Sequence, residues 1–350
     1  MNSPKITDYL KLALTRVLVP IILVLSLASP LAAGPFEDAA AAHNKGDYAT
    51  AFRLWRPFAD QGNANAQVNL ALMYAKGQGT PQNYSEALKW FRLAANQGET
   101  AAQFNLGLMY ANGEGVPQDY AEALKWYRLA ADQGNANAQS NLGVMYVKGQ
   151  GTPQNYAEAV KWYRKAAENG YAAAQFNLGL MYANGEGVPQ DYAEALKWYR
   201  LAADQGNANA QSNLGVMYVK GQGTTQNHVE ALMWFRLAAN QGDADAQYNL
   251  GLMYAKSRGV ALDYVEAMKW FQKAAEQDNA TAQFGLGAMY ANGQGVPRDR
   301  VRAQMWVTLA AAHGDQEAVK YRDILAERMT PAELAEARKL AREWKPKSAR

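Results

Sequence analysis

The sequence contains no cysteine among its 350 residues and only three histidines. The absence of cysteine excludes disulfide bonds, thiolate metal ligands and cysteine nucleophiles. His43, His228 and His313 lie far apart and lack the spacing of metal ligands, so we expect neither a metal site nor a bound cofactor. Neither G-x-S-x-G nor S-x-x-K occurs, and no catalytic residue is predicted.

The chain also has little net charge, with 35 basic and 32 acidic residues and a formal charge of +3. A nucleic-acid-binding protein would need a clearly basic face, so we expect no nucleic-acid partner. Basic residues do cluster near the end of the chain, and we interpret them as a solvated helix face and tail: Arg338, Lys339, Arg342, Lys345, Lys347 and Arg350.

Long apolar runs are absent except near the start, where Val17 to Leu25 follows three basic residues and precedes the small residues 31–34. This order predicts a signal peptide over residues 1–33, cleaved after Ala33. The alternative is an uncleaved anchor, but Pro20 interrupts the run and the run is short for a membrane span. Cleavage removes three basic residues and one acidic residue, which lowers the formal charge to +1. We therefore expect a periplasmic or secreted protein with no further membrane contact, and the lack of cysteine fits a bacterial envelope.

What the sequence does contain is a repeat of 36 residues. One copy is Ala101 to Gly134, AAQFNLGLMYANGEGVPQDYAEALKWYRLAADQG, and a glutamine marks each of seven copies in strict register: Gln67, Gln103, Gln139, Gln175, Gln211, Gln247 and Gln283. The segment from Ala101 to Thr152 is identical to that from Ala173 to Thr224. Such regularity indicates a stacked array, with a shortened capping repeat at 34–62, seven repeats over 63–314, and capping helices with a basic tail at 315–350.

Each copy reads as two helices joined by a loop. In the first copy, the apolar spacing predicts a helix from Ala64 to Lys76. Two glycines and a proline then predict the loop, and pairs such as Asp119 and Glu122 have the spacing of a capping box at the start of the second helix. A glycine in the middle of the first helix predicts close approach of a neighbouring backbone. The tryptophan of each second helix is predicted to pack against the next repeat.

The pattern A-Q-x-N-L-G-x-M-Y-x-x-G-x-G-V-P-Q-D-Y-x-E-A-x-K-W-Y resembles the Sel1-like repeat, a relative of the tetratricopeptide repeat. The closing RMTPAELAEARKLAREW resembles the tails of exported bacterial members. The resemblance implies an all-α, right-handed solenoid of helix-turn-helix repeats that acts as a non-enzymatic adaptor for other proteins. Some cysteine-rich relatives are linked to β-lactam hydrolysis, but this chain has none of their cysteines, so that activity does not carry over.

If the first helices line the inner curve, as the resemblance implies, one position there varies between copies and is aromatic in four of them. We predict that these residues bind a partner: Phe104, Phe176, Tyr248 and Phe284. The alternative is that they are packed between repeats. Neighbouring amides and a basic rim complete the predicted face: Asn105, Asn177, Asn249, Lys148, Lys220 and Lys256. The asparagines also fit a structural hydrogen bond, because they recur in nearly every copy.

We therefore expect a monomeric, exported scaffold whose concave face binds a protein or peptide, in envelope signalling or assembly. Two alternatives stay open. One is an enzyme, a ligand-binding protein or a hydrolase-associated receptor for cell-wall or saccharide material, in which the aromatic rings stack on sugars. The other is a purely structural spacer.

Overall fold

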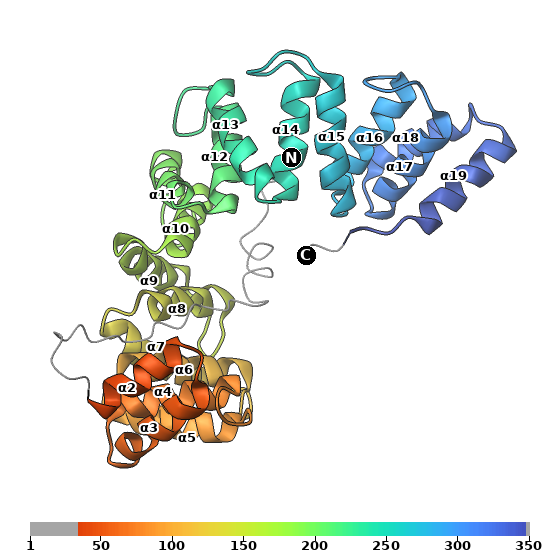
Figure 1. The fold of residues 1–350 in the computed structure, drawn as a ribbon. Helices are drawn as coiled ribbons and strands as arrows, with labels where there is room; N and C mark the ends of the chain where they lie inside the picture. Colours follow the sequence, from red (N-terminus) through yellow and green to blue (C-terminus); the bar gives the residue numbers. More distant parts are fainter. Residues whose placement is uncertain (1–33, 348–350) are drawn as a thin grey trace. The chain divides into compact units, whose positions relative to one another are not determined.

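The computed structural model describes residues 34–347, which form eighteen helices and no strand (Figure 1). The all-α prediction is therefore confirmed for this part of the chain. Residues 1–33, where the signal peptide is predicted, lie outside the described residues. No helix among the described residues is long and apolar enough to span a membrane. The chain divides into two compact units, the first ending at Gln190 and the second beginning at Asp191, and each is described by itself.

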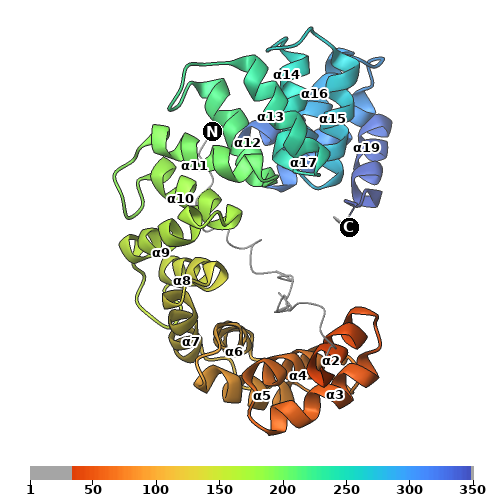
Figure 2. The same cartoon turned by 60° about the vertical axis from the view of Figure 1, so that its left-hand side comes forward.

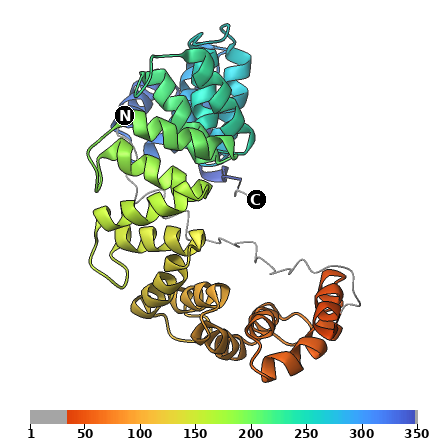
Figure 3. The same cartoon turned by 90° about the vertical axis from the view of Figure 1, so that its left-hand side faces the viewer.

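The first unit is a succession of helix pairs, visible as stacked hairpins in red to yellow-green in Figure 3. Helices adjacent in sequence pack against each other throughout it. Its elements are α2 (Pro35–Asn44), α3 (Tyr48–Asp60), α4 (Ala64–Lys76), α5 (Tyr84–Asn96), α6 (Thr100–Asn112), α7 (Tyr120–Asp132), α8 (Ala136–Lys148), α9 (Tyr156–Glu168) and α10 (Ala172–Asn184). Helix α4 has the bounds that the sequence predicted.

The second unit continues the alternation of first and second helices (Figure 2). It ends in two helices outside the 36-residue period. Its elements are α11 (Tyr192–Asp204), α12 (Ala208–Lys220), α13 (His228–Asn240), α14 (Ala244–Ala255), α15 (Tyr264–Glu276), α16 (Ala280–Asn292), α17 (Arg300–Ala312), α18 (Gln316–Ala326) and α19 (Pro331–Glu343). The first helices α12 and α14 of successive repeats touch directly. We call the helix before the loop of each repeat the first helix and the one after it the second helix.

The loop residues end and start the helices as their chemistry requires. Gly113 closes α6 with φ of 74°, in the left-handed region that glycine enters without a steric cost. Asp119 then caps α7, since its Oδ1 accepts a hydrogen bond from the Glu122 backbone N–H at 3.0 Å. The Glu122 side chain does not return this bond but pairs with Lys125, so only half of the predicted capping box forms. A complete box occurs at α19, between Thr330 and Glu333.

The mid-helix glycines make room for a bulky side chain of the second helix, which is aromatic in most repeats and Val307 opposite Gly287. A Cβ atom added to Gly107 would lie 2.6 Å from Cδ1 of Tyr127, on the second helix of the same repeat. Phe271 occupies the same place opposite Gly251. Main-chain atoms come close at two of these glycines, since an added Cβ would lie 3.1 Å from the Ala267 carbonyl oxygen at Gly251 and 3.2 Å from the Ala303 carbonyl oxygen at Gly287. The predicted backbone approach is therefore confirmed at these two positions, and a bulky side chain of the second helix adds to it.

The tryptophans join repeats, but in the direction opposite to the one predicted. Trp270 of α15 belongs to a buried cluster with Phe235 of α13 and Leu250 of α14, and thus packs against the preceding repeat. Trp306 likewise clusters with Phe271 of the repeat before it. Three of the indoles, those of Trp90, Trp162 and Trp234, also meet a guanidinium group from that side, and the Arg128 guanidinium lies 4.9 Å from the ring centre of Trp162.

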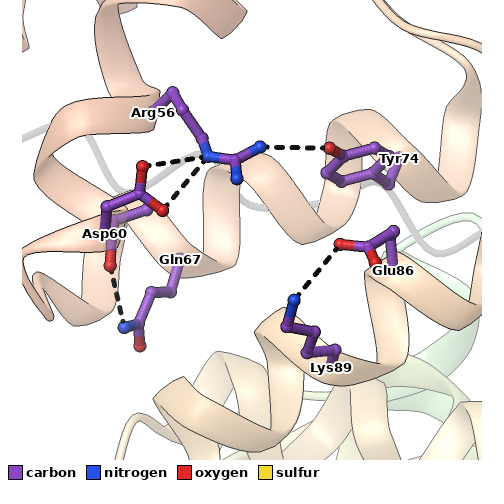
Figure 4. Close-up of polar contacts among 7 residues, drawn as sticks. Arg56, Asp60, Gln67, Tyr74, Glu86 and Lys89 are labelled. Carbon is purple, nitrogen blue, oxygen red and sulfur yellow. Dashed lines mark hydrogen bonds and ion pairs between the residues drawn. The ribbon is translucent and has the colours of Figure 1, made fainter.

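Buried glutamines form a polar ladder along the stack. The Nε2 of Gln67 donates to the Ala59 carbonyl at the end of α3, at 3.1 Å (Figure 4). Its Oε1 accepts from Gln97 at the end of α5, at 2.8 Å. The marker glutamines therefore satisfy helix carbonyls that stacking has removed from water. Figure 4 also shows Arg56 reaching from Asp60 to the Tyr74 hydroxyl, a contact between successive repeats.

Candidate partner-binding face

Each first helix leaves one narrow face open. In α6, Ala101, Asn105 and Leu108 are half-buried and Asn112 is exposed, while the other residues from Ala102 to Tyr110 are buried. These four positions are spaced i, i+4, i+7 and i+11, which places them in one row along the helix. We call this row the open stripe. The same positions in the first unit are Asn65, Asn69, Leu72, Lys76; Asn137, Asn141, Val144, Lys148; and Ala173, Asn177, Leu180, Asn184, and in the second Asn209, Asn213, Val216, Lys220; Asp245, Asn249, Leu252, Lys256; and Thr281, Gly285, Ala288, Asn292. The third residue of the row is buried at Leu72 and Leu180.

The aromatic position predicted for binding lies beside the open stripe, not on it. Phe104 and Phe176 are each only 6% exposed, so the expected exposure of these two rings was wrong. The Phe104 ring packs on Tyr127 of its own repeat, with ring centres 5.9 Å apart. Phe104 precedes Asn105 of the open stripe by one residue, which corresponds to a rotation of about 100° around the helix axis. This rotation directs the Phe104 side chain away from the open stripe and toward the second helix. The same position is also buried in the repeats that carry serine there, at Ser140 and Ser212.

Tyr248 and Phe284 are half-buried and keep part of their surface. The Tyr248 ring stacks on Phe271 at 5.6 Å, and burial raises the pKa of its hydroxyl. Phe284 meets Tyr321 of α18 edge-on at the same distance. The saccharide alternative requires open faces of these rings for stacking on sugars. The contacts with Phe271 and Tyr321 cover one face or edge of each ring and so reduce the area available for stacking.

The predicted asparagines do lie on the open stripe. Asn105 is half-buried, and its Nδ2 donates to the Ala101 carbonyl at 2.8 Å. The Asn141 side chain instead hydrogen-bonds the Tyr127 hydroxyl of the preceding repeat, a group whose pKa burial raises. Asn177 and Asn249 are half-buried at the same position. The position therefore combines a structural hydrogen bond with partial access from solvent.

The predicted lysines end the open stripe in several repeats. Lys220 and Lys256 are exposed, whereas Lys148 is half-buried, and this burial lowers the pKa of its ammonium group. Within the seven open stripes Asp245 is the one acidic residue, against four lysines. The face thus offers amides, small aliphatic surfaces and positive charge. The sequence predicted the lysines and asparagines of the open stripe. It did not predict which side of the first helix is open, because that depends on the side against which the second helix packs.

The described residues contain no group of three or more histidine, cysteine, aspartate or glutamate side chains that could hold a metal ion. One histidine makes a polar contact at a repeat junction, where Nε2 of His313 lies 3.2 Å from Oδ1 of Asp278. Asp278 also accepts from Gln283, so these side chains replace the glutamine ladder there.

Comparison with known families decides what these repeats are. The Sel1 repeat model matches residues 44–63 and then seven consecutive 36-residue segments, from 64–99 to 280–315. The chain belongs to the Sel1 repeat family. It is an all-α solenoid of Sel1 repeats, and Sel1 repeat proteins are generally non-catalytic scaffolds for protein interactions.

Solved structures of Sel1 repeat proteins are similar to it. A Sel1 repeat protein from Oxalobacter formigenes is 34% identical, with 87% of this chain and 98% of that one covered and a TM-score of 0.64. The protein c5321, described as a protective antigen of uropathogenic Escherichia coli strains, is 32% identical over 88% of this chain and 83% of its own, with a TM-score of 0.46. No curated protein matches the chain.

Proposed function

We propose that this Sel1 repeat protein is an exported, non-catalytic scaffold that binds a peptide segment of a partner protein along the open stripes of one unit. The observation that supports this most is the repetition of the row itself. An asparagine occupies its second position in six of the seven first helices, followed by leucine or valine and then by lysine or asparagine. Only the last first helix departs from this order, with Gly285 and Ala288.

The chemistry of the row suits an extended peptide with acidic side chains. Asparagine amides can both donate to and accept from a peptide main chain, and Leu108 or Val144 gives a small apolar contact between them. Lys148 in the first unit, or Lys220 and Lys256 in the second, would pair with carboxylates of the ligand, an attraction that salt weakens. Export by the predicted signal peptide would deliver this surface to the bacterial envelope.

Selection from a random 12-residue peptide library displayed on phage tests the proposal. Selected peptides should be rich in aspartate and glutamate, and their affinity can be measured by calorimetry at two salt concentrations. Changing Lys220 and Lys256 together to Gln tests the second unit, and Lys148→Gln tests the first. In the unit that holds the peptide, the change should weaken binding by about tenfold or more, because each lysine contributes a charge pair at the contact.

A matched control removes the same charge elsewhere. Lys197 and Lys269 are exposed on second helices of the second unit, and Lys125 is exposed on one of the first, so Lys197→Gln with Lys269→Gln, or Lys125→Gln alone, should leave peptide affinity unchanged. Equal loss in both variants would reduce the effect to net charge and contradict the proposed site. Failure to select any peptide, together with calorimetric binding of muropeptides, would favour the saccharide alternative instead.

A further inference from the structure

The outward faces of the second helices form a second surface. Comparing the same positions in successive repeats shows where this surface is unusually apolar. In the seven full repeats, three positions of each second helix face outward at i, i+4 and i+8. They read Ser85, Lys89, Leu93; Ala121, Lys125, Leu129; Ala157, Lys161, Lys165; Ala193, Lys197, Leu201; Val229, Met233, Leu237; Val265, Lys269, Lys273; and Val301, Met305, Leu309. Of these seven helices, only α13 and α17 carry valine, methionine and leucine at all three.

On α17 the three apolar residues are covered. Helix α19 packs against α17, and Val301, Met305 and Leu309 are all half-buried. Met305 and Leu309 pack against the same buried cluster as Trp344, which ends α19 and meets Trp306 with ring centres 5.8 Å apart. The contact is held at its far end by Lys347, whose backbone N–H donates to the Glu276 carbonyl at 2.7 Å. The fold thus shows what this set of side chains accepts, namely one face of an amphipathic helix.

On α13 the same three residues are bare. Val229, Met233 and Leu237 are 66%, 44% and 44% exposed. The apolar surface extends to the next repeat, where Leu262 and Val265 are also exposed and Gly259 of the same loop lies against the start of α13. Leu262 stands where the five preceding repeats have a glutamine that hydrogen-bonds a helix carbonyl, as Gln226 does to Val219 at 2.6 Å. These substitutions increase exposed apolar area and remove polar groups, which is costly unless something covers them.

The charges next to this surface point the same way. Glu86, Glu122, Glu158, Glu194 and Glu266 each pair with the lysine three residues later. In α13 the place of that lysine is taken by Met233, so the half-buried Glu230 has no lysine three residues later. A carboxylate beside an apolar row, without its usual cation, is complementary to a ligand that brings a lysine or arginine.

We infer that Val229, Met233 and Leu237 of α13 form a docking site for an amphipathic helix of a partner protein, with the chemistry of α19. Such a helix presents leucine, alanine and tryptophan on one face and a basic side chain near Glu230. In α19 the covered face consists of Leu334, Ala337, Leu340, Ala341 and Trp344, with Arg338, Lys339 and Arg342 exposed beside it. This site is separate from the open stripes, and it does not depend on the peptide proposed to bind there.

The test uses a fluorescein-labelled synthetic peptide of residues 329–347 as the probe. It is titrated with protein purified from cells that express the full-length chain, and binding is followed by fluorescence anisotropy. Saturable binding is expected, and Val229→Ala with Met233→Lys should weaken it by about tenfold or more. Both substitutions restore residues that α11 already carries, so the fold accommodates them.

Two controls separate binding at α13 from binding elsewhere on the protein. Leu129→Lys introduces the residue that α9 carries at the equivalent place, and it should leave peptide binding unchanged. Binding that persists in the Val229→Ala, Met233→Lys variant would show that the peptide only exchanges with α19 on α17, and would overturn the inference. Absence of binding to the unmodified protein would overturn it as well.

Two further measurements test whether the α13 surface binds a second copy of the chain or a membrane instead of a partner helix. Sedimentation velocity that shows a dimer lost on Met233→Lys would assign the surface to a second copy of the chain, against a partner helix. Flotation with vesicles of anionic phospholipid, lost on the same substitution, would assign it to a membrane surface. A monomer that binds the peptide and ignores the vesicles is the result expected.

Discussion

Ser257 shows how a single residue can depart from the repeat at a cost. It has φ of 52°, in the left-handed region, where six other copies of the repeat have glycine, such as Gly221 with φ of 66°. A residue with a Cβ atom is disfavoured in this conformation by about 1–2 kcal/mol. The Ser257 hydroxyl offsets little of this cost, because it donates one solvent-exposed hydrogen bond, to the Val260 carbonyl at 3.2 Å.

Ser257→Gly should therefore stabilise the protein. The expected gain is about 0.5–1 kcal/mol, because glycine relieves the strain but gives the unfolded chain more freedom. The urea midpoint, followed by circular dichroism at 222 nm, measures it. Gly221→Ser is the reciprocal control and should lower the midpoint. A lower midpoint for Ser257→Gly would mean that the hydroxyl contact outweighs the backbone strain.

At the scale of helices, two marker glutamines of the ladder, Gln139 and Gln283, have no donor to Oε1 among the described residues. Gln133 at the end of α7 donates to Oε1 of Gln103 at 2.7 Å, whereas Asn169 holds the equivalent position at the end of α9. The asparagine is one methylene shorter, and Oε1 of Gln139 is buried without a partner among the described residues. A buried acceptor without a hydrogen bond costs about 1–3 kcal/mol.

Exchanging these two residue types tests the ladder in both directions. Asn169→Gln should raise the free energy of unfolding by about 1 kcal/mol, since it supplies the missing donor. Gln133→Asn should lower it by a similar amount, because it leaves Gln103 in the state now seen at Gln139. Equal and small effects in both variants would show that water already satisfies these acceptors.

At the scale of the molecule, stability depends on contacts between neighbours. Helices pack against those adjacent in sequence, and Trp270 joins three of them, α13, α14 and α15. In an array of this kind, a local defect weakens nearby repeats and leaves distant ones almost untouched.

Trp270→Ala should therefore have a local effect. Removing a buried indole costs about 3–5 kcal/mol, and the loss should fall on the repeats that share its cluster. Hydrogen exchange followed by mass spectrometry should rise in α13 to α16 and stay unchanged in α4 to α7. Trp90→Ala should give the reverse pattern. A uniform rise in exchange for either variant would show that the whole chain unfolds as one cooperative unit.

The architecture was predictable from the sequence because its signals are local and repeated. The 36-residue period, the bounds of α4, the cap at Asp119 and the glycine that ends α6 all depend on residues close together in the chain. Because the repeat recurs seven times, each of these local patterns could be checked at several places in the chain. The same regularity identified the Sel1 repeat before any contact was known.

Which face of each first helix is open depended on the tertiary structure. Phe104 and Asn105 are neighbours in sequence, yet one is buried and the other borders solvent, because Tyr127 crosses the helix at Gly107. The bare apolar row of α13 is likewise recognisable only beside α17, where α19 covers the same side chains. Burial is a property of what packs against a residue, and a sequence pattern specifies the helix but not its neighbours.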